Sequence, residues 1–136
     1  MLAVDTNVFV RLIAGDDDPK QAASARALIQ RGPIWVSRTV LLETNWVLES
    51  VFKFTANEIR DAFVRALGMD GVQIEDPAGV AATLNLTLQG VGFADALHLA
   101  GSPPGIPFVT FDRAFIRRAK RAGVTGISEP ADHLSR

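Results

Sequence analysis

The sequence predicts an α/β fold with three layers, α/β/α, built on a central, mainly parallel sheet of four or five strands. Short apolar runs alternate with longer segments of helical spacing, and this alternation is typical of a parallel sheet covered on both faces. The 136 residues suffice for one domain with a hydrophobic core but not for two of ordinary size. We therefore expect a single domain over residues 1–136, with a loose C-terminal tail after about residue 129.

The elements are predicted from apolar spacing and from residues that start or stop helices. Strands are expected at residues 2–4, 34–36, 72–74 and 107–110, with a weaker one near 124–127. Helices are expected at residues 7–14, 19–30, 39–54, 57–67, 77–88, 93–100 and 113–122. Two helices follow an aspartate-proline pair, at Asp18-Pro19 and Asp76-Pro77, in which aspartate caps the helix and proline occupies its first position.

The composition excludes several classes of protein. The chain has no cysteine, which excludes a disulfide scaffold, a thiolate zinc site and a cysteine nucleophile. No apolar run approaches the roughly 18 residues that a membrane span needs, and the first residues lack the features of a secretion signal. We therefore expect a cytoplasmic protein.

Charge is nearly balanced overall but uneven along the chain. The net charge of −1 does not indicate a nucleic-acid-binding protein. One short segment nevertheless gathers five cations, Arg113, Arg117, Arg118, Lys120 and Arg121. These side chains are candidate contacts for RNA phosphates, and the alternative is an ordinary solvated helix face.

Four acidic residues fall beside the carboxyl ends of predicted strands, where open α/β sheets bind their ligands. Asp5 follows the first strand directly, and Asp112 comes shortly after the strand that ends at residue 110. Glu43 lies in the first turns of the helix after the second strand, and Asp95 lies in the first turn of helix 93–100. We expect all four to face the same edge of the sheet.

The surroundings of two of these acids indicate a metal. Glu43 shares a helical stripe with Trp46 and Val47, and Asp95 shares one with Leu99, so we expect both acids to face inward. Two carboxylates about 4 Å apart repel by about 4 kcal/mol at an effective dielectric constant of about 20, and neither stripe carries a cation. Oxygen ligands without histidine or thiolate favour Mg²⁺, or Mn²⁺, over zinc.

Each acid also has a purely structural interpretation. Asp5 and Asp112 could be helix caps, and Asp95 could be a first-turn acid favoured by the helix dipole. Glu43 could pair with Arg38. The coincidence of four such acids at one edge of the sheet nevertheless favours the metal site.

Other residues near the acids have two interpretations each. Polar side chains that flank the acids could support a metal site or merely cap helices; they are Thr6, Asn7 and Thr110. His98 could relay a proton or orient Asp95, although a packed histidine is the commoner outcome. Trp46 is favoured as a core or interface residue over a base-stacking one.

Four segments of the sequence resemble the acidic motifs of PIN domains. They read "LAVDTNVFV", "LLETNWVL", "GFADALHLA" and "FVTFD", and the resemblance extends from Leu2 to about Val124. Their order and spacing carry the resemblance, since each motif alone is short. Within the superfamily, the compact length is similar to that of VapC-type toxins of toxin–antitoxin pairs.

The resemblance implies an α/β/α fold and a Mg²⁺- or Mn²⁺-dependent ribonuclease. It implies that Asp5, Glu43, Asp95 and Asp112 bind the metal and form the catalytic site. For a toxin of this kind it further implies a homodimer and a cognate antitoxin. Cleavage of RNA would leave a 5′-phosphate and a 3′-hydroxyl.

Two other functions fit parts of the pattern. An aspartate after the first strand also describes aspartyl-phosphate phosphotransfer enzymes, but those of the haloacid dehalogenase type need a second acid at the position that Asn7 occupies here. A catalytically inert PIN-like module that only binds RNA or a protein is the second alternative. Metal-assisted hydrolysis of RNA phosphodiesters accounts for more of the residues than either.

Overall fold

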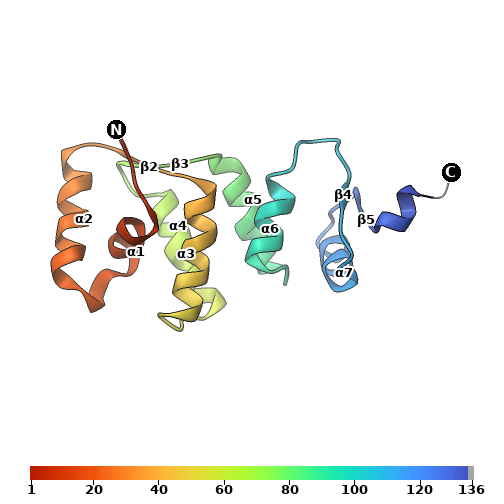
Figure 1. The fold of residues 1–136 in the computed structure, drawn as a ribbon, viewed down its shortest axis with the longest axis horizontal. Helices are drawn as coiled ribbons and strands as arrows, with labels where there is room; N and C mark the ends of the chain where they lie inside the picture. Colours follow the sequence, from red (N-terminus) through yellow and green to blue (C-terminus); the bar gives the residue numbers. More distant parts are fainter. Residues whose placement is uncertain (135–136) are drawn as a thin grey trace. The chain divides into compact units, whose positions relative to one another are not determined.

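A computed structural model describes residues 1–134, apart from the side chain of Asp16. The chain forms two compact units, one spanning Met1–Pro77 and the other beginning at Ala78 (Figure 1). None of the described helices combines the length and the apolar character that crossing a bilayer requires. The expected single domain over residues 1–136 stays a prediction.

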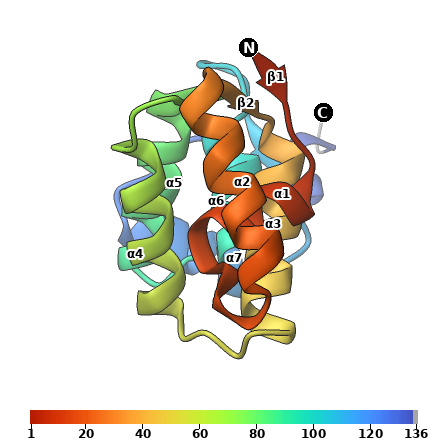
Figure 2. The ribbon, with the colours of Figure 1, turned by 90° about the vertical axis from the view of Figure 1, so that its left-hand side faces the viewer.

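The first unit holds a three-stranded parallel sheet and four α-helices among its described residues (Figure 2). Its elements are β1 (Leu2–Ala3), α1 (Thr6–Ala14), a 3₁₀-turn (Gly15–Asp17), α2 (Pro19–Arg31), β2 (Ile34–Val36), α3 (Arg38–Ser50), α4 (Ala56–Leu67) and β3 (Val72–Ile74). The strand order is β1-β2-β3, with Leu2 opposite Ile34 and Ile34 opposite Val72. Because the strands are parallel, the chain leaves β1 and β2 at the same edge of the sheet.

Helix α1 is central to this unit, since it packs against α2, α3 and α4. The buried side chains along these contacts are large and apolar; among those with less than 2% exposure are Phe9, Leu41, Leu48 and Phe63. Burying such side chains stabilises the fold by about 1.5–3 kcal/mol each. This packing fixes the direction in which α1 and α3 leave the sheet.

Side chains cap the starts of several helices, which explains where those helices begin. The capping residues are Asp5 for α1, Asp18 for α2, Ser37 for α3, Thr55 for α4 and Asp112 for α7 (Arg113–Arg121). In α4 the cap is reciprocal, because Thr55 accepts from the Glu58 N–H and Glu58 accepts from the Thr55 N–H. Each cap satisfies one of the backbone N–H groups that a helix leaves without a partner at its start.

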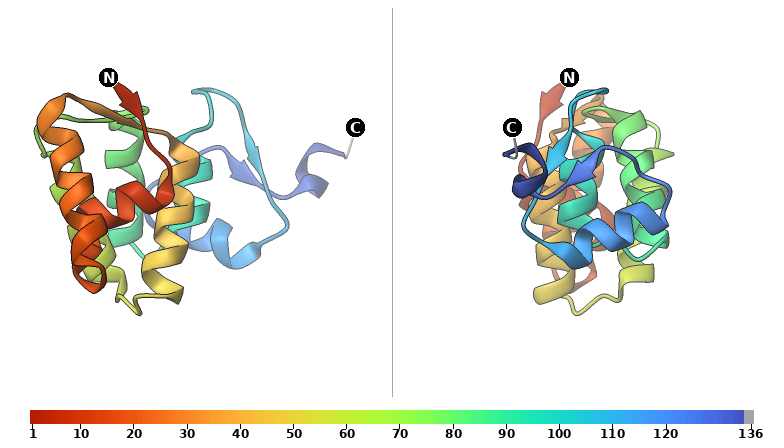
Figure 3. Two further views of the ribbon diagram at one scale, coloured as in Figure 1. Left: turned by 60° about the vertical axis from the view of Figure 1, so that its left-hand side comes forward. Right: turned by 90° about the vertical axis from the view of Figure 1, so that its right-hand side faces the viewer.

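The second unit contains α5 (Pro77–Leu88, whose first residue belongs to the first unit), α6 (Phe93–Ala100), β4 (Phe108–Val109), α7 (Arg113–Arg121), β5 (Ile127–Ser128) and a 3₁₀-helix (Pro130–His133). Strands β4 and β5 are parallel, with Phe108 opposite Ile127 (Figure 3). One hydrophobic cluster of this unit consists of six buried residues, Val91, Ala96, Phe115, Ile116, Ala119 and Ile127. The rings of Phe108 and Phe115 meet edge to face, with centroids 5.8 Å apart.

The predicted α/β class is confirmed. Within residues 1–134, all seven predicted helices and all five predicted strands are present, three strands in one sheet and two in the other. The weakest prediction, a strand near 124–127, is displaced to Ile127–Ser128.

The prediction for α3 is wrong at its C-terminal end. The helix stops at Ser50 rather than at residue 54, and Lys53 adopts a left-handed conformation with φ of 59°. The N–H of Phe54 then donates to the carbonyl oxygen of Leu48 at 2.9 Å. A left-handed residue cannot continue a right-handed helix, although the apolar spacing continues past it.

The segment after Glu129 also differs from the expected loose tail. Residues 130–133 form a 3₁₀-helix, in which Glu129 and Asp132 cap each other reciprocally. Ser128 Oγ and His133 Nε2 are 2.8 Å apart in a further hydrogen bond. These polar contacts hold residues 128–133 in a defined structure. They cannot be predicted from the spacing of apolar residues.

Candidate metal centre

Asp5 lies between β1 and α1, at the edge of the sheet where the first strand ends. Its Oδ1 accepts a hydrogen bond from the Val8 N–H at 3.1 Å, so the capping interpretation is confirmed. Within residues 1–134, Oδ2 has no hydrogen-bond partner. A carboxylate has about four lone-pair positions, so capping leaves Asp5 able to bind a cation as well.

Glu43 lines the same pocket as Asp5. The pocket is formed by α1 and α3 with the turn that precedes α1, and its lining residues are Asp5, Thr6, Asn7, Val10, Glu43 and Val47. No lysine or arginine is among them. The structure therefore brings two of the four predicted acids together, with two polar neighbours predicted to support them.

The expected inward orientation of Glu43 is wrong. Glu43 is exposed, and Trp46, on the same predicted stripe, has 63% of its surface exposed. The buried face of α3 is made by Leu41, Thr44 and Leu48 instead. Glu43 thus reaches the pocket from the solvent side of the helix, where a carboxylate can be hydrated in the absence of a cation.

The proposed pairing of Glu43 with Arg38 is also wrong. Arg38 Nη1 lies 3.5 Å from Asp76 Oδ2, and the Arg38 backbone N–H donates to Glu75 Oε1 at 2.9 Å. Within the described residues, Glu43 makes no ion pair or hydrogen bond. Arg38, the cationic residue of α3, therefore does not neutralise the negative charge of Glu43.

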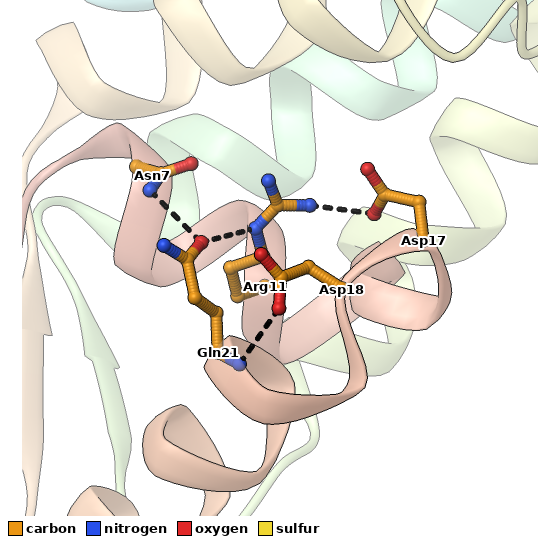
Figure 4. Close-up of polar contacts among 5 residues, drawn as sticks. All are labelled: Asn7, Arg11, Asp17, Asp18 and Gln21. Carbon is orange, nitrogen blue, oxygen red and sulfur yellow. Dashed lines mark hydrogen bonds and ion pairs between the residues drawn. The ribbon is translucent and has the colours of Figure 1, made fainter.

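Asn7 is held by a polar network that sequence reasoning missed (Figure 4). Its Nδ2 donates to Gln21 Oε1 at 3.4 Å, and the same oxygen accepts from Arg11 Nε at 2.8 Å. Arg11 also pairs with Asp17, with only 18% of the Arg11 side chain exposed. The network ties α1 to the start of α2, and no spacing rule could find it because Gln21 is on another helix.

Asp95 and Asp112 belong to the second unit. Asp95 is half-buried in the first turn of α6, in the position that the helix-dipole interpretation requires, and it has no hydrogen bond or ion pair within residues 1–134. Asp112 caps α7, because its Oδ1 accepts from the Phe115 N–H at 3.0 Å. Thr110 supports this turn, since its Oγ1 accepts from the Asp112 N–H at 3.0 Å.

His98, on α6 after Asp95, is exposed rather than packed. The packed histidine favoured by the sequence is therefore wrong.

The five predicted phosphate-contacting cations are exposed on α7, opposite its buried residues Phe115, Ile116 and Ala119. One of them is already paired, since Arg113 Nε lies 2.7 Å from Glu129 Oε1. This hydrogen bond and the negative charge of Glu129 raise the pKa of Arg113. Both interpretations of the cationic segment, phosphate contact and solvated face, require the exposure that is observed.

The donors around the first unit's pocket suit a hard divalent cation. They are the carboxylates of Asp5 and Glu43, the hydroxyl of Thr6 and the amide oxygen of Asn7, and such oxygen donors are preferred by Mg²⁺ and Mn²⁺. Among the described residues of either unit taken alone, no three histidine, aspartate or glutamate side chains gather closely enough to hold an ion. The residues present in the pocket thus fit part of a Mg²⁺ ligand set.

Comparison with known proteins identifies a family for this chain. No curated protein matches the chain significantly. The model of the PIN domain family matches residues 2–121, well over half of the 136 residues. The match includes all four predicted acids, and it confirms the resemblance that the four motifs indicate. The chain therefore belongs to the PIN domain family.

Proposed function

We propose that this protein is a Mg²⁺-dependent endoribonuclease in which Mn²⁺ can replace Mg²⁺. The observation that carries the proposal is the pocket in which Asp5 and Glu43 meet without a compensating cation among its lining residues. PIN domains are typically metal-dependent nucleases, so the family match supports a metal-binding role for the pocket. RNA as the substrate follows from the resemblance of the motifs.

In this proposal Asp5, Glu43, Asp95 and Asp112 hold the metal and form the catalytic site, and Thr6, Asn7 and Thr110 support it. A bound divalent cation supplies stabilisation of the charge that develops on the phosphoryl oxygens, and it lowers the pKa of water. Asp95 and Asp112 are included in the proposed site because they lie in the motifs "GFADALHLA" and "FVTFD".

The protein's own contribution is orientation. The hydrogen bond from the Val8 N–H holds the Asp5 carboxylate at the start of α1. Gln21 engages the amide nitrogen of Asn7, so the Asn7 carbonyl oxygen is the group left for a ligand. Groups fixed in this way need little reorganisation when substrate binds, which is the general basis of electrostatic catalysis.

Cleavage of RNA by the purified protein tests this proposal. We expect cleavage with Mg²⁺, none with excess EDTA, and products with 5′-phosphate and 3′-hydroxyl ends. Asp95→Asn should remove activity, whereas the control Asp61→Asn, at an exposed aspartate of α4, should keep it. Undiminished cleavage by a folded Asp95→Asn variant would contradict the proposed site.

We further propose that the nuclease is the toxin of a toxin–antitoxin pair and acts as a homodimer. The support is the resemblance of this compact chain to VapC-type toxins. Expression alone should arrest growth, and expression of Asp95→Asn should not. Sequencing of RNA 5′ ends from the two cultures would identify the target. Normal growth during strong expression of the active protein would contradict the toxin role and leave the nuclease role standing.

A further inference from the structure

The basic residues of α7 are not equivalent. A pocket beside α7 and β5 is lined by Arg113, Ile116, Arg117, Lys120, Ser128, Glu129 and Asp132. Three of the five cations of the helix therefore face one pocket, while Arg118 and Arg121 lie outside it. The helix packs against β5 (Figure 3), and the 3₁₀-helix after β5, with its cap Glu129, completes the pocket.

Within this pocket Arg113 is already engaged. Glu129 accepts from Arg113 Nε at 2.7 Å, and its side chain also takes part in the reciprocal cap with Asp132. Within the described residues, Glu129 thus contacts both the Arg113 guanidinium and the 3₁₀-helix that follows it. Arg113 keeps further N–H donors, but Glu129 compensates its positive charge, so Arg113 attracts a second anion less strongly while the pair holds.

Arg117 and Lys120 are different, because neither makes an ion pair or a hydrogen bond within residues 1–134. They are three residues apart on one helix, so their Cβ atoms are about 5–6 Å apart. Two neighbouring cations that line one pocket can neutralise phosphates of a single backbone together. Within the described residues, Arg117 and Lys120 are therefore two positive charges of one pocket that no carboxylate pairs with.

We propose that this pocket binds the phosphate backbone of RNA through Arg117 and Lys120, and that Glu129 withholds Arg113 from that contact. The inference rests on the proposed function in one respect, which is that RNA is the ligand. It narrows the five candidate cations of the sequence to two, and it assigns Glu129 a restraining role.

The salt dependence of RNA binding tests the two cations. A labelled, unstructured oligouridylate is titrated with the protein in EDTA, so that no cleavage occurs. Each phosphate neutralised on a single strand contributes about 0.7 to the slope of log K against log[salt]. The pair Arg117→Gln/Lys120→Gln should therefore lower the magnitude of that slope by about 1.4, which is twice 0.7.

The matched control is Arg118→Gln/Arg121→Gln, which removes the same charge from the same helix outside the pocket. It should leave the slope nearly unchanged. Thermal unfolding of each variant checks that it is folded. An equal loss of slope in both double variants would overturn the proposal in favour of a uniformly solvated basic face.

Glu129→Gln tests the restraint in the opposite direction. Glutamine keeps one acceptor oxygen, for Arg113 or for the Asp132 N–H, and it removes the negative charge. We expect tighter RNA binding and a steeper slope, by about 0.7 for one further phosphate contact. Glu49→Gln, at an exposed glutamate of α3, is the control and should change neither. Unchanged or weaker binding by Glu129→Gln would contradict the assigned role.

Two comparisons separate this inference from the proposed function. If the wild-type protein does not cleave RNA with Mg²⁺ but the variants show the expected slopes in EDTA, the nuclease function is refuted and the RNA-binding pocket is supported. If the wild-type protein cleaves RNA but both double variants have equal slopes, only the proposed RNA-binding pocket is refuted. Binding of polyglutamate that depends on Arg117 and Lys120, without any effect on RNA, would also refute it, because the pocket would then serve an acidic protein.

Discussion

Arg38 pairs with Asp76, the Nη1 of Arg38 lying 3.5 Å from the Oδ2 of Asp76. Arg38 is on the same helix as Glu43, so this pairing directs the nearest cation of α3 away from the pocket that Glu43 shares with Asp5. No lysine or arginine among the lining residues therefore compensates the carboxylates of that pocket. A divalent cation is the ligand that such a charge favours.

Asp5 both caps α1 and lines the pocket, and two substitutions separate these roles. Asparagine caps helices as well as aspartate does, whereas alanine cannot cap. Asp5→Asn should therefore unfold at nearly the same urea concentration as the wild type and yet lose RNase activity. Asp5→Ala should lose activity and also about 1 kcal/mol of unfolding free energy. Full activity in Asp5→Asn would show that the carboxylate only caps.

Gln21 joins Asn7 to Arg11, so its removal should loosen the contact of α1 with α2. Gln21→Ala leaves Arg11 with Asp17 as its remaining partner in this network. We expect a loss of about 1 kcal/mol of unfolding free energy, the typical net value of such hydrogen bonding. Lys20→Ala, at the exposed neighbouring position, should cost less than half as much. Urea unfolding measures both, and equal losses would show that the network does not contribute.

Thr44 and Thr83 form a natural pair for a stability experiment. Both are completely buried in helices, but the Thr83 hydroxyl donates to the Gly79 carbonyl at 2.8 Å. Thr44 Oγ1 has no hydrogen-bond partner among the described residues. A buried hydroxyl without a partner is unfavourable. Thr44→Val should therefore raise the free energy of unfolding by about 1 kcal/mol.

Thr83→Val removes a satisfied hydroxyl and should lower the free energy of unfolding, or leave it unchanged. Thermal and urea unfolding of the two variants give the comparison. A destabilised Thr44→Val protein would mean that the hydroxyl has a partner after all, such as an ordered water molecule.

Much of the fold is predictable from the sequence because its signals are local. Apolar spacing predicts the helices and strands. Asp18 caps α2 and Pro19 is its first residue, as predicted, and α5 begins at Pro77. The end of α3 and the 3₁₀-helix after Glu129 were not predictable. They depend on the left-handed Lys53 and on reciprocal side-chain caps, which leave no periodic signal.

The candidate site is likewise predictable from the sequence only in part. The position of Asp5 at a strand end could be predicted from strand order, and its meeting with Glu43 in one pocket agrees with that reasoning. The orientation of Glu43 could not, because the choice of the buried face of α3 is made by tertiary packing of Leu41, Thr44 and Leu48. Gln21 could not be predicted either, since its contact to Asn7 joins two helices.

The most direct test of the metal pocket is the melting temperature with and without Mg²⁺ for three proteins: wild type, Glu43→Gln and Glu49→Gln. The two substitutions are identical and lie on the same helix, but only Glu43 lines the pocket. A cation that binds only the folded state raises the melting temperature by mass action. We predict that Mg²⁺ stabilises the wild type and Glu49→Gln, and stabilises Glu43→Gln much less. An equal rise in all three proteins, or no rise in the wild type, would contradict the account.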